Sequence, residues 1–274
     1  MRKKIVPALI YLELILVSLA VLMVVVWIVM SSFNQGDSLA TTSLIPEKLT
    51  FDNYVNLFTN TDYPLWFMNT LKIAVINTVL SVFMVMVTAW IMSRFQFKGK
   101  KFGLMTLLLM SMFPSFLSMT ALYTLFLALG LVGEPISLVI IYSAGAIPYN
   151  TWLVKGYLDG IPKAIDEAAY IDGCGRFKSF FYMILPLSKS IITYCAVSQF
   201  MMPWMDYALP NLLLSGDENR TLAVGLFMLI DGKENSYFTT FAAGAVLISV
   251  PIIIVFFLFQ KYLVQGVAAG ANKG

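Results

Sequence analysis

The residues best suited to a specific interaction lie in one stretch of the chain, residues 161–186, which reads IPKAIDEAAYIDGCGRFKSFFYMILP. Asp166 and Glu167 offer charge for polar contacts, and the neighbouring Ala168 and Ala169 leave a helix surface flat enough for a partner backbone to approach closely. The 274-residue chain contains no histidine, the commonest general base and metal ligand. The pattern suits a docking surface, and we expect no catalytic and no metal site in this chain.

Two short helices separated by a glycine are predicted for this stretch. Pro162 suits a first helical turn, where its missing N–H costs nothing. The two carboxylates then fall near the positive end of that helix, which favours them. Gly173 is placed to end the helix in the left-handed conformation. A second helix is expected from near Arg176, and Pro186 would mark the entry to a membrane span.

An ordinary interfacial helix is the alternative for the same residues. In that case the charges merely face water, and the aromatic side chains of Phe177, Phe180 and Phe181 face lipid. The local physics alone leaves both interpretations open.

The elements that position this stretch are predicted to be membrane helices. Hydrophobic residues make up 59% of the chain and charged residues 12%, against roughly 45–50% and 25% in soluble domains. The mean hydropathy is +0.81. About 20 apolar residues cross a bilayer core of roughly 30 Å. The sequence predicts an all-α polytopic membrane protein with about six transmembrane helices, near Leu9–Met30, Phe67–Met92, Phe102–Leu129, Ile136–Leu158, Leu187–Leu209 and Phe238–Tyr262.

The first span is expected to be a retained signal anchor, because its apolar stretch is too long for a cleaved signal peptide and lacks a small-residue cleavage site. Six spans place both termini on one side. With both termini in the cytoplasm, fourteen basic residues lie inside and four lie on or near the outside, which is a positive-inside bias. The inner set is Arg2, Lys3, Lys4, Arg94, Lys98, Lys100, Lys101, Lys155, Lys163, Arg176, Lys178, Lys189, Lys261 and Lys273, and the outer set is Lys48, Lys72, Arg220 and Lys233.

Five residues in or near the spans are candidates for a translocation path. Tyr142, Asn150 and Trp152 combine aromatic faces with hydrogen-bonding groups, as a sugar ring requires, and Asn77 could line a pore. Asp206 is ionisable at membrane depth, where such residues usually face a cavity or a partner. Helix packing, with Asp206 in a water-exposed interfacial belt, is the alternative for the same residues.

The loop resembles the cytoplasmic EAA loop of bacterial ATP-binding-cassette (ABC) importer permeases through Glu167-Ala168-Ala169, Asp172-Gly173, Phe180 and Ile184-Leu185-Pro186. The match extends over about twenty residues with the family spacing intact. Cys174 departs from the usual small alanine, and Ser190 stands where a second proline is frequent. The resemblance implies a coupling helix that contacts a cytoplasmic ATPase, with the coupling residues Glu167, Ala168, Ala169, Asp172, Gly173, Phe180 and Pro186.

From Pro64 onward the chain is similar to the carbohydrate branch of these permeases, in particular to the second permease subunit of maltose/maltodextrin importers. The segments that carry this are Asn69-Thr70-Leu71, Arg94–Gly99, Pro148–Trp152 and Gln265–Gly274. The resemblance implies a type I ABC-importer permease fold, and that the tail residues Ala271, Asn272, Lys273 and Gly274 reach between the ATPase subunits. The expected parts are an anchor with an external loop (1–66) and a permease core (67–274) that carries the coupling loop (161–186) and the tail (265–274).

The family implies a complex in the bacterial inner (cytoplasmic) membrane. Its other members would be a second, different permease subunit, two ATP-binding-cassette ATPase subunits and an extracytoplasmic solute-binding protein, with sugar as substrate and membrane lipid around the spans. The chain has no G-x-x-x-x-G-K-[ST] phosphate-binding loop. We therefore expect ATP and Mg²⁺ on the ATPase subunits and no cofactor on this chain. Its basic residues are too scattered for a nucleic-acid surface.

The expected function is the import of a sugar or oligosaccharide, maltodextrin-like or related, driven by ATP hydrolysis in separate subunits. An ion-coupled secondary carrier is the alternative. Such a carrier usually has inverted repeats and several intramembrane charges, and the number of spans does not exclude it. A membrane-embedded enzyme is disfavoured by the missing histidines and the lack of clustered acids. The residues identify neither the sugar nor whether the outside is a periplasm.

Overall fold

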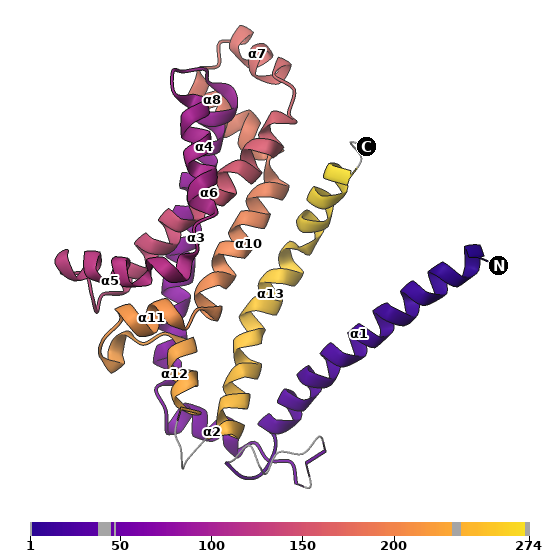
Figure 1. Ribbon diagram of the computed structural model, residues 1–274, viewed down its shortest axis with the longest axis vertical. Coiled ribbons are helices and arrows are strands. Elements are labelled where there is room, and N and C mark those ends of the chain that lie inside the picture. Colours follow the sequence, from indigo (N-terminus) through magenta and orange to yellow (C-terminus); the bar gives the residue numbers. More distant parts are fainter. Residues whose placement is uncertain (1, 38–44, 47, 232–236, 272–274) are drawn as a thin grey trace. The chain divides into compact units, whose positions relative to one another are not determined.

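The computed structural model describes residues 2–37, 45–46, 48–231 and 237–271, and this part of the chain is helical (Figure 1). Its one β-type contact is an isolated antiparallel bridge between Asn34 and Leu49, and the described residues contain no strand. Long apolar segments form helices because lipid offers no hydrogen bonds, so the backbone must satisfy its own polar groups. The all-α prediction is confirmed.

The elements in chain order are α1 (Arg2–Ser32), α2 (Asp52–Thr59), α3 (Tyr63–Arg94), α4 (Lys100–Ser111), η2 (Ser115–Ser118), α5 (Met119–Ala128), α6 (Pro135–Asp159), α7 (Ala164–Ile171), α8 (Arg176–Ser179), η3 (Phe180–Ile184), α9 (Leu185–Leu187), α10 (Lys189–Met205), α11 (Ala208–Leu213), η4 (Asp217–Asn219), α12 (Leu222–Met228) and α13 (Phe238–Ala271).

Among the described residues, four helices are long and apolar enough to cross a membrane, and two bent helix pairs raise that number to six if each pair is one span. The four are Ile10–Ser32 within α1, all of α3, all of α6, and Phe238–Tyr262 within α13. They occupy the positions predicted for spans one, two, four and six. The two bent pairs occupy the positions predicted for spans three and five.

The third predicted span, Phe102–Leu129, is not one straight helix. α4 ends at Ser111, and the segment Phe116–Ala128 continues at 90° to it. Pro114 lies in the break with an extended backbone (ψ 116°). Because proline has no N–H and its ring clashes with the preceding turn, it interrupts a helix at this point.

The fifth predicted span, Leu187–Leu209, is also bent. The segment Arg176–Leu187, which contains the π-helical turn η3, meets α10 at 80°. Ser188 lies at the break and donates its hydroxyl to the carbonyl oxygen of Ile184 at 2.7 Å, a back-bond that favours bending. α10 ends at Met205, because Asp206 is extended (ψ 118°).

The chain divides into two compact units, of which the first combines Met1–Leu65 with Val224–Pro251 and the second combines Trp66–Ala223 with Ile252–Gly274. In the first unit, the buried Asn53 donates from Nδ2 to the carbonyl oxygens of Ser32 (3.0 Å) and Asn34 (2.8 Å). Its Oδ1 lies 3.0 Å from Thr239 Oγ1. These bonds join the end of α1, α2 and the start of α13.

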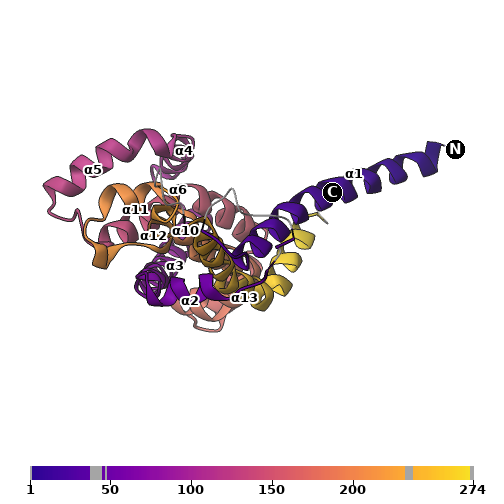
Figure 2. The same ribbon diagram turned by 90° about the horizontal axis from the view of Figure 1, so that it is seen from below.

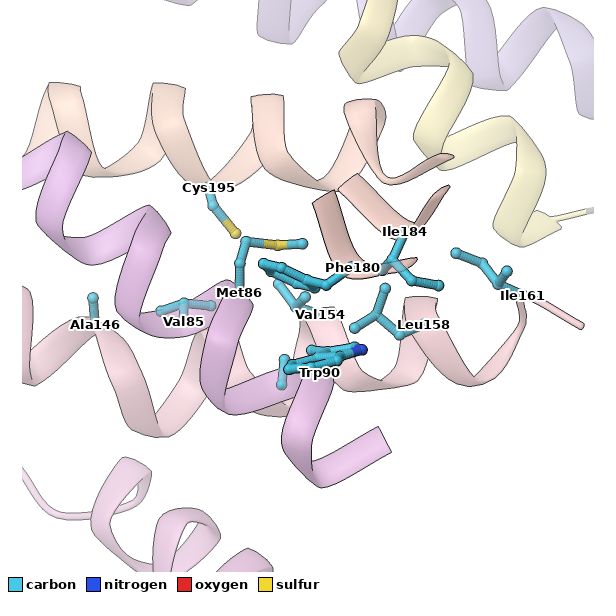
Figure 3. Packing of buried hydrophobic residues seen from close by; sticks show 11 residues of the cluster. Val85, Met86, Trp90, Ala146, Val154, Leu158, Ile161, Phe180, Ile184 and Cys195 are labelled. Atoms are coloured by element: carbon cyan, nitrogen blue, oxygen red, sulfur yellow. The ribbon is translucent and has the colours of Figure 1, made fainter. Parts of the chain in front are cut away.

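The second unit has its core between α3, α6 and the segment from α8 to α10. Met86 and Trp90 of α3, Leu158 of α6, Phe180 of η3 and Cys195 of α10 converge in one buried cluster (Figure 3). α4 packs against α6 on another side. This core includes Phe180 of the loop 161–186 and so supports that loop.

Candidate functional site

Residues 161–186 form the two short helices that the sequence predicts. α7 carries Asp166 and Glu167 in its first turn, and α8 begins at Arg176. Gly173 separates them with φ +80°, the left-handed conformation expected of it. The local prediction for this loop is confirmed.

A Schellman motif ends α7. The N–H of Gly173 donates to the carbonyl oxygen of Tyr170 (3.1 Å), and the N–H of Cys174 donates to that of Ala169 (2.8 Å). These two bonds satisfy carbonyls that the end of a helix leaves without partners. They also set the direction in which the chain leaves α7.

Arg94, the last residue of α3, holds α7 in place. Its Nε lies 2.8 Å from Oδ2 of Asp166, and the two side chains are 8% and 9% exposed. Its Nη1 and Nη2 donate to the carbonyl oxygens of Leu158 and Ile161, each at 3.0 Å. Ser179 of α8 donates its hydroxyl to Oδ1 of Asp166 at 3.2 Å. One guanidinium thus joins α3, the end of α6 and α7.

The position of this guanidinium is favourable for two reasons. The C-terminal end of α6 carries partial negative charge on its last carbonyls, which a cation stabilises. The buried carboxylate of Asp166 would be costly without a cation and a hydrogen-bond donor beside it. Sequence reasoning treated Arg94 only as a cytoplasmic cation and part of a family segment. Nothing in the sequence pairs it with Asp166, because the two lie in different helices.

α7 has one buried and one exposed face. Asp166 and Ala169 are 6% and 2% exposed, whereas Glu167 and Ala168 are exposed and Ile171 is 87% exposed. The predicted flat patch is therefore wrong for Ala169, because residues three apart on a helix share a face and Asp166 faces inward. The residues that α7 leaves exposed are Ala164, Glu167, Ala168, Tyr170 and Ile171.

Phe180 lies inside the second unit. Its ring centroid is 4.7 Å from that of Trp90, and the side chain is 3% exposed. Phe177 and Phe181 are exposed, so the interfacial interpretation fits these two aromatics and is wrong for Phe180. The remaining residues assigned to coupling, Asp172, Gly173 and Pro186, are exposed.

Asn77 binds neighbouring helices. Its Nδ2 donates to the carbonyl oxygen of Gln199 at 2.8 Å. Its Oδ1 accepts from the hydroxyls of Ser81 (2.9 Å) and Ser143 (3.3 Å). The side chain is fully buried and links α3 to α6 and α10, as in the helix-packing alternative.

Tyr142 and Asp206 form a pair between α6 and the start of α11. The Tyr142 hydroxyl donates to Oδ2 of Asp206 at 2.8 Å. Oδ1 of Asp206 accepts from the backbone N–H groups of Ala208 (2.9 Å) and Leu209 (3.3 Å), so this carboxylate caps α11. The pair sets the position of α11 relative to α6.

The other two candidates make separate contacts. Asn150 donates to the carbonyl oxygen of Ala146 one turn earlier (2.9 Å), and the Trp152 indole N–H donates to that of Leu104 in α4 (3.0 Å). At a rise of 1.5 Å per residue, Trp152 lies about 15 Å along α6 from Tyr142. The five predicted path residues are therefore not brought together in one site.

Residues 265–271 of the predicted tail continue the helix α13. Ala271 is the last described residue, and Asn272, Lys273 and Gly274 lie outside the described residues.

Sequence reasoning missed a cavity of about 520 Å³ between α5 and α11. In the sequence, only Tyr207, which follows the candidate Asp206, pointed to a site in this region. The bend that places α5 beside α11 could not be predicted from the sequence. The cavity is lined by Phe116, Met119, Thr120, Tyr123, Tyr207, Ala208, Asn211 and Leu212.

Comparison with known proteins places the chain among bacterial transport permeases. It is 41% identical over 267 residues to the galactooligosaccharides transport system permease protein GanQ of Bacillus subtilis, covering 96% of this chain and 94% of that protein. It is 35% identical to the maltodextrin transport system permease protein MalD of Streptococcus pneumoniae, covering 100% and 98%. It is 34% identical to the maltose/maltodextrin transport system permease protein MalG of Escherichia coli, covering 96% and 95%.

The fold matches a chain from the crystal structure of a bacterial ABC transporter involved in the import of the acidic polysaccharide alginate. The TM-score is 0.83 at 22% identity, covering 95% of this chain and 97% of that one. The family described as "Binding-protein-dependent transport system inner membrane component" matches residues 84–269, more than half of the chain. The chain therefore belongs to this family, and is a multi-pass ABC-importer permease.

Proposed function

We propose that this chain is the permease subunit through which an ABC importer moves a sugar or oligosaccharide into the cytoplasm. Relatives that align over almost their whole length are named for galactooligosaccharide, maltodextrin and maltose transport. The secondary-carrier alternative finds no support among these relatives. A short neutral oligosaccharide is the substrate class that these names share.

Coupling to ATP hydrolysis is assigned to the exposed face of α7. The observation that carries this is the buried Arg94–Asp166 pair, which holds α7 against the ends of α3 and α6. Because α7 is tied to two spans through one guanidinium, a displacement of its exposed face by an ATPase would be passed to both spans. Glu167, Ala168 and Ile171 would form the contact with the ATPase.

The partners follow from the family. A second, different permease subunit would complete the pathway, two ATPase subunits would bind ATP and Mg²⁺, and an extracytoplasmic solute-binding protein would deliver the sugar. A second solved structure with this fold (TM-score 0.73, 15% identity) is of a bacterial alginate ABC transporter in complex with an alginate pentasaccharide-bound periplasmic protein, which supports the last of these. The tail Ala271–Gly274 is proposed to reach the ATPases, and this chain to bind no cofactor.

Both termini and the α7 loop are proposed to lie in the cytoplasm, as the bias of basic residues indicates. The two native cysteines allow a direct test. Cys174, at the end of α7, is partly exposed, whereas Cys195 is buried. A membrane-impermeant maleimide should label Cys174 in inside-out vesicles and leave it unlabelled in right-side-out vesicles. The reverse pattern would contradict this orientation.

Glu167→Lys tests the coupling assignment. Glu167 is exposed and makes none of the bonds that hold α7, so the variant should insert and assemble normally. In the purified complex in proteoliposomes, we expect sugar uptake to be lost, with ATP hydrolysis no longer stimulated by the loaded binding protein. Glu134→Lys, an equal charge reversal at the exposed start of α6, is the control and should transport normally. Normal uptake by Glu167→Lys would show that α7 does not couple transport.

A further inference from the structure

We propose that the cavity between α5 and α11 binds one neutral sugar unit of the transported oligosaccharide. This inference rests on the proposed function and adds the place of binding and the charge class of the ligand. α5 and α11 contact each other and lie side by side in both views (Figures 1 and 2). The cavity volume of about 520 Å³ falls in the range of roughly 300–1,000 Å³ that small-molecule sites occupy.

Each wall of the cavity supplies at least one aromatic ring and one hydrogen-bonding group, and Phe116 adds a third ring. Thr120 and Tyr123 lie one turn apart on α5. Tyr207 and Asn211 lie one turn apart at the start of α11, where the Asn211 N–H donates to the Tyr207 carbonyl oxygen at 3.0 Å. A pyranose presents apolar C–H faces ringed by hydroxyls. Aromatic rings cover such faces, while amides and hydroxyls bond to the edge.

The lining selects against charged sugars. None of the eight lining residues is a lysine, arginine, aspartate or glutamate. The carboxylate of Asp206, next to Tyr207 in the chain, is already bonded to Tyr142 and to two N–H groups of α11. A uronate would have to shed water without meeting a cation, which a carboxylate needs when it leaves solvent. A neutral hexose carries no such cost.

Two of the predicted path residues acquire a role through this cavity. Tyr142 and Asp206 do not line it. They anchor the start of α11 to α6, and so hold the wall that carries Tyr207 and Asn211. They are therefore positioning residues for the sugar, while Tyr207 and Asn211 are the residues that contact it.

Protection of an engineered thiol tests the site without relying on transport. Asn211→Cys is introduced with Cys174→Ser in the complete importer, and labelling by a small water-soluble maleimide is followed with maltotriose, galactotriose or an alginate trisaccharide present. Thr124→Cys, on α5 but outside the cavity, is the matched control. We expect at least one neutral trisaccharide to slow labelling of the Asn211→Cys thiol roughly tenfold, as for about 90% occupancy. The alginate trisaccharide should have no effect, and Thr124→Cys should not respond to any sugar.

Equal slowing at both thiols, slowing by the alginate trisaccharide, or no slowing by either neutral sugar would overturn the proposal. Uptake in proteoliposomes separates its failure from that of the proposed function. If a neutral trisaccharide is imported while the Asn211→Cys thiol stays unprotected, only the assignment of the cavity is wrong. If neither neutral trisaccharide is imported, both the cavity assignment and the proposed function are wrong.

For the importing complex, Tyr207→Leu should raise the sugar concentration needed for half-maximal uptake roughly tenfold. Tyr207→Phe keeps the ring, and its half-maximal concentration should stay within about twofold of the wild type. Equal effects of the two variants would also overturn the proposal.

Discussion

Within the second unit, the polar side chains of the α7 loop and those of the α5–α11 cavity differ in burial and in bonding. At the loop, the side chains of Arg94 and Asp166 are buried, and they contact each other, two backbone carbonyls and one hydroxyl. At the cavity, Thr120 and Asn211 are exposed and line an open space. Buried polar groups that are held by an ion pair and several hydrogen bonds make a rigid joint, because any movement would break these contacts in a low dielectric. Polar groups that line a space remain available to a ligand. These differences are those expected if, as proposed, the loop transmits force from the ATPase and the cavity binds the sugar.

The largest expected effect comes from breaking the joint. Arg94→Leu leaves the Asp166 carboxylate buried without a cation, which costs about 3–5 kcal/mol. We expect α7 to detach, uptake to be lost, and limited proteolysis to cut between residues 161 and 175. The double variant Arg94→Leu/Asp166→Leu removes both charges and should recover most of the protection. A single variant as resistant to protease as the wild type would refute the idea of a joint.

A smaller effect is expected at the Tyr142–Asp206 pair, which supports one wall of the cavity. Tyr142→Phe removes the hydroxyl that donates to Asp206, a loss of about 1–3 kcal/mol for a bond to a charged group. Thermal unfolding of the purified complex should shift downward, and labelling of Asn211→Cys should change, while proteolysis of the α7 loop stays as in the wild type. Tyr149→Phe, at an exposed tyrosine of α6, is the control and should change none of these. A change in loop proteolysis would show that the two regions are not independent.

Gly173 tests how far the joint depends on backbone conformation alone. A Cβ at this position would meet no atom within 4 Å, so the cost of a side chain is confined to the strain of φ +80°. For Gly173→Val we expect about 1–2 kcal/mol, normal membrane levels, and uptake reduced up to roughly tenfold. Asparagine tolerates the left-handed region better, and Gly173→Asn should retain more activity. Equal uptake by wild type, Asn and Val would mean that this turn does not orient α7.

The smallest effect is expected at a second ion pair, between Lys155 and Asp159, which is more exposed than the Arg94–Asp166 pair. Lys155 Nζ lies 2.6 Å from Asp159 Oδ2, and the side chains are 17% and 45% exposed. Because solvent screens such a pair, Lys155→Met should cost less than about 1 kcal/mol, and the hydroxyl of Ser93 still bonds to Asp159. Uptake and protease resistance should match the wild type. A loss of uptake and protease resistance as large as that of Arg94→Leu would mean that the difference in burial does not make one pair more important than the other.

The sequence by itself determined the features that depend only on residues close together along the chain. Long apolar runs predicted where the spans lie, because crossing lipid requires a helix of that length whatever surrounds it. Gly173 and the first-turn carboxylates predicted the ends of α7, since caps act within one turn. The EAA-type spacing led to the family, because a docking loop must present its residues at fixed intervals.

The tertiary structure decided everything that depends on which helices meet. Arg94 and Asp166 pair because the ends of α3 and α6 meet beside α7, and the same packing turns Ala169 inward. Asn77, Tyr142, Asn150 and Trp152 looked alike as polar or aromatic residues in apolar runs, yet each has a different partner. The cavity exists because the 90° bend after α4 lays α5 beside α11. A side chain's type states what it can bond to, but only the packing of distant segments selects its partner.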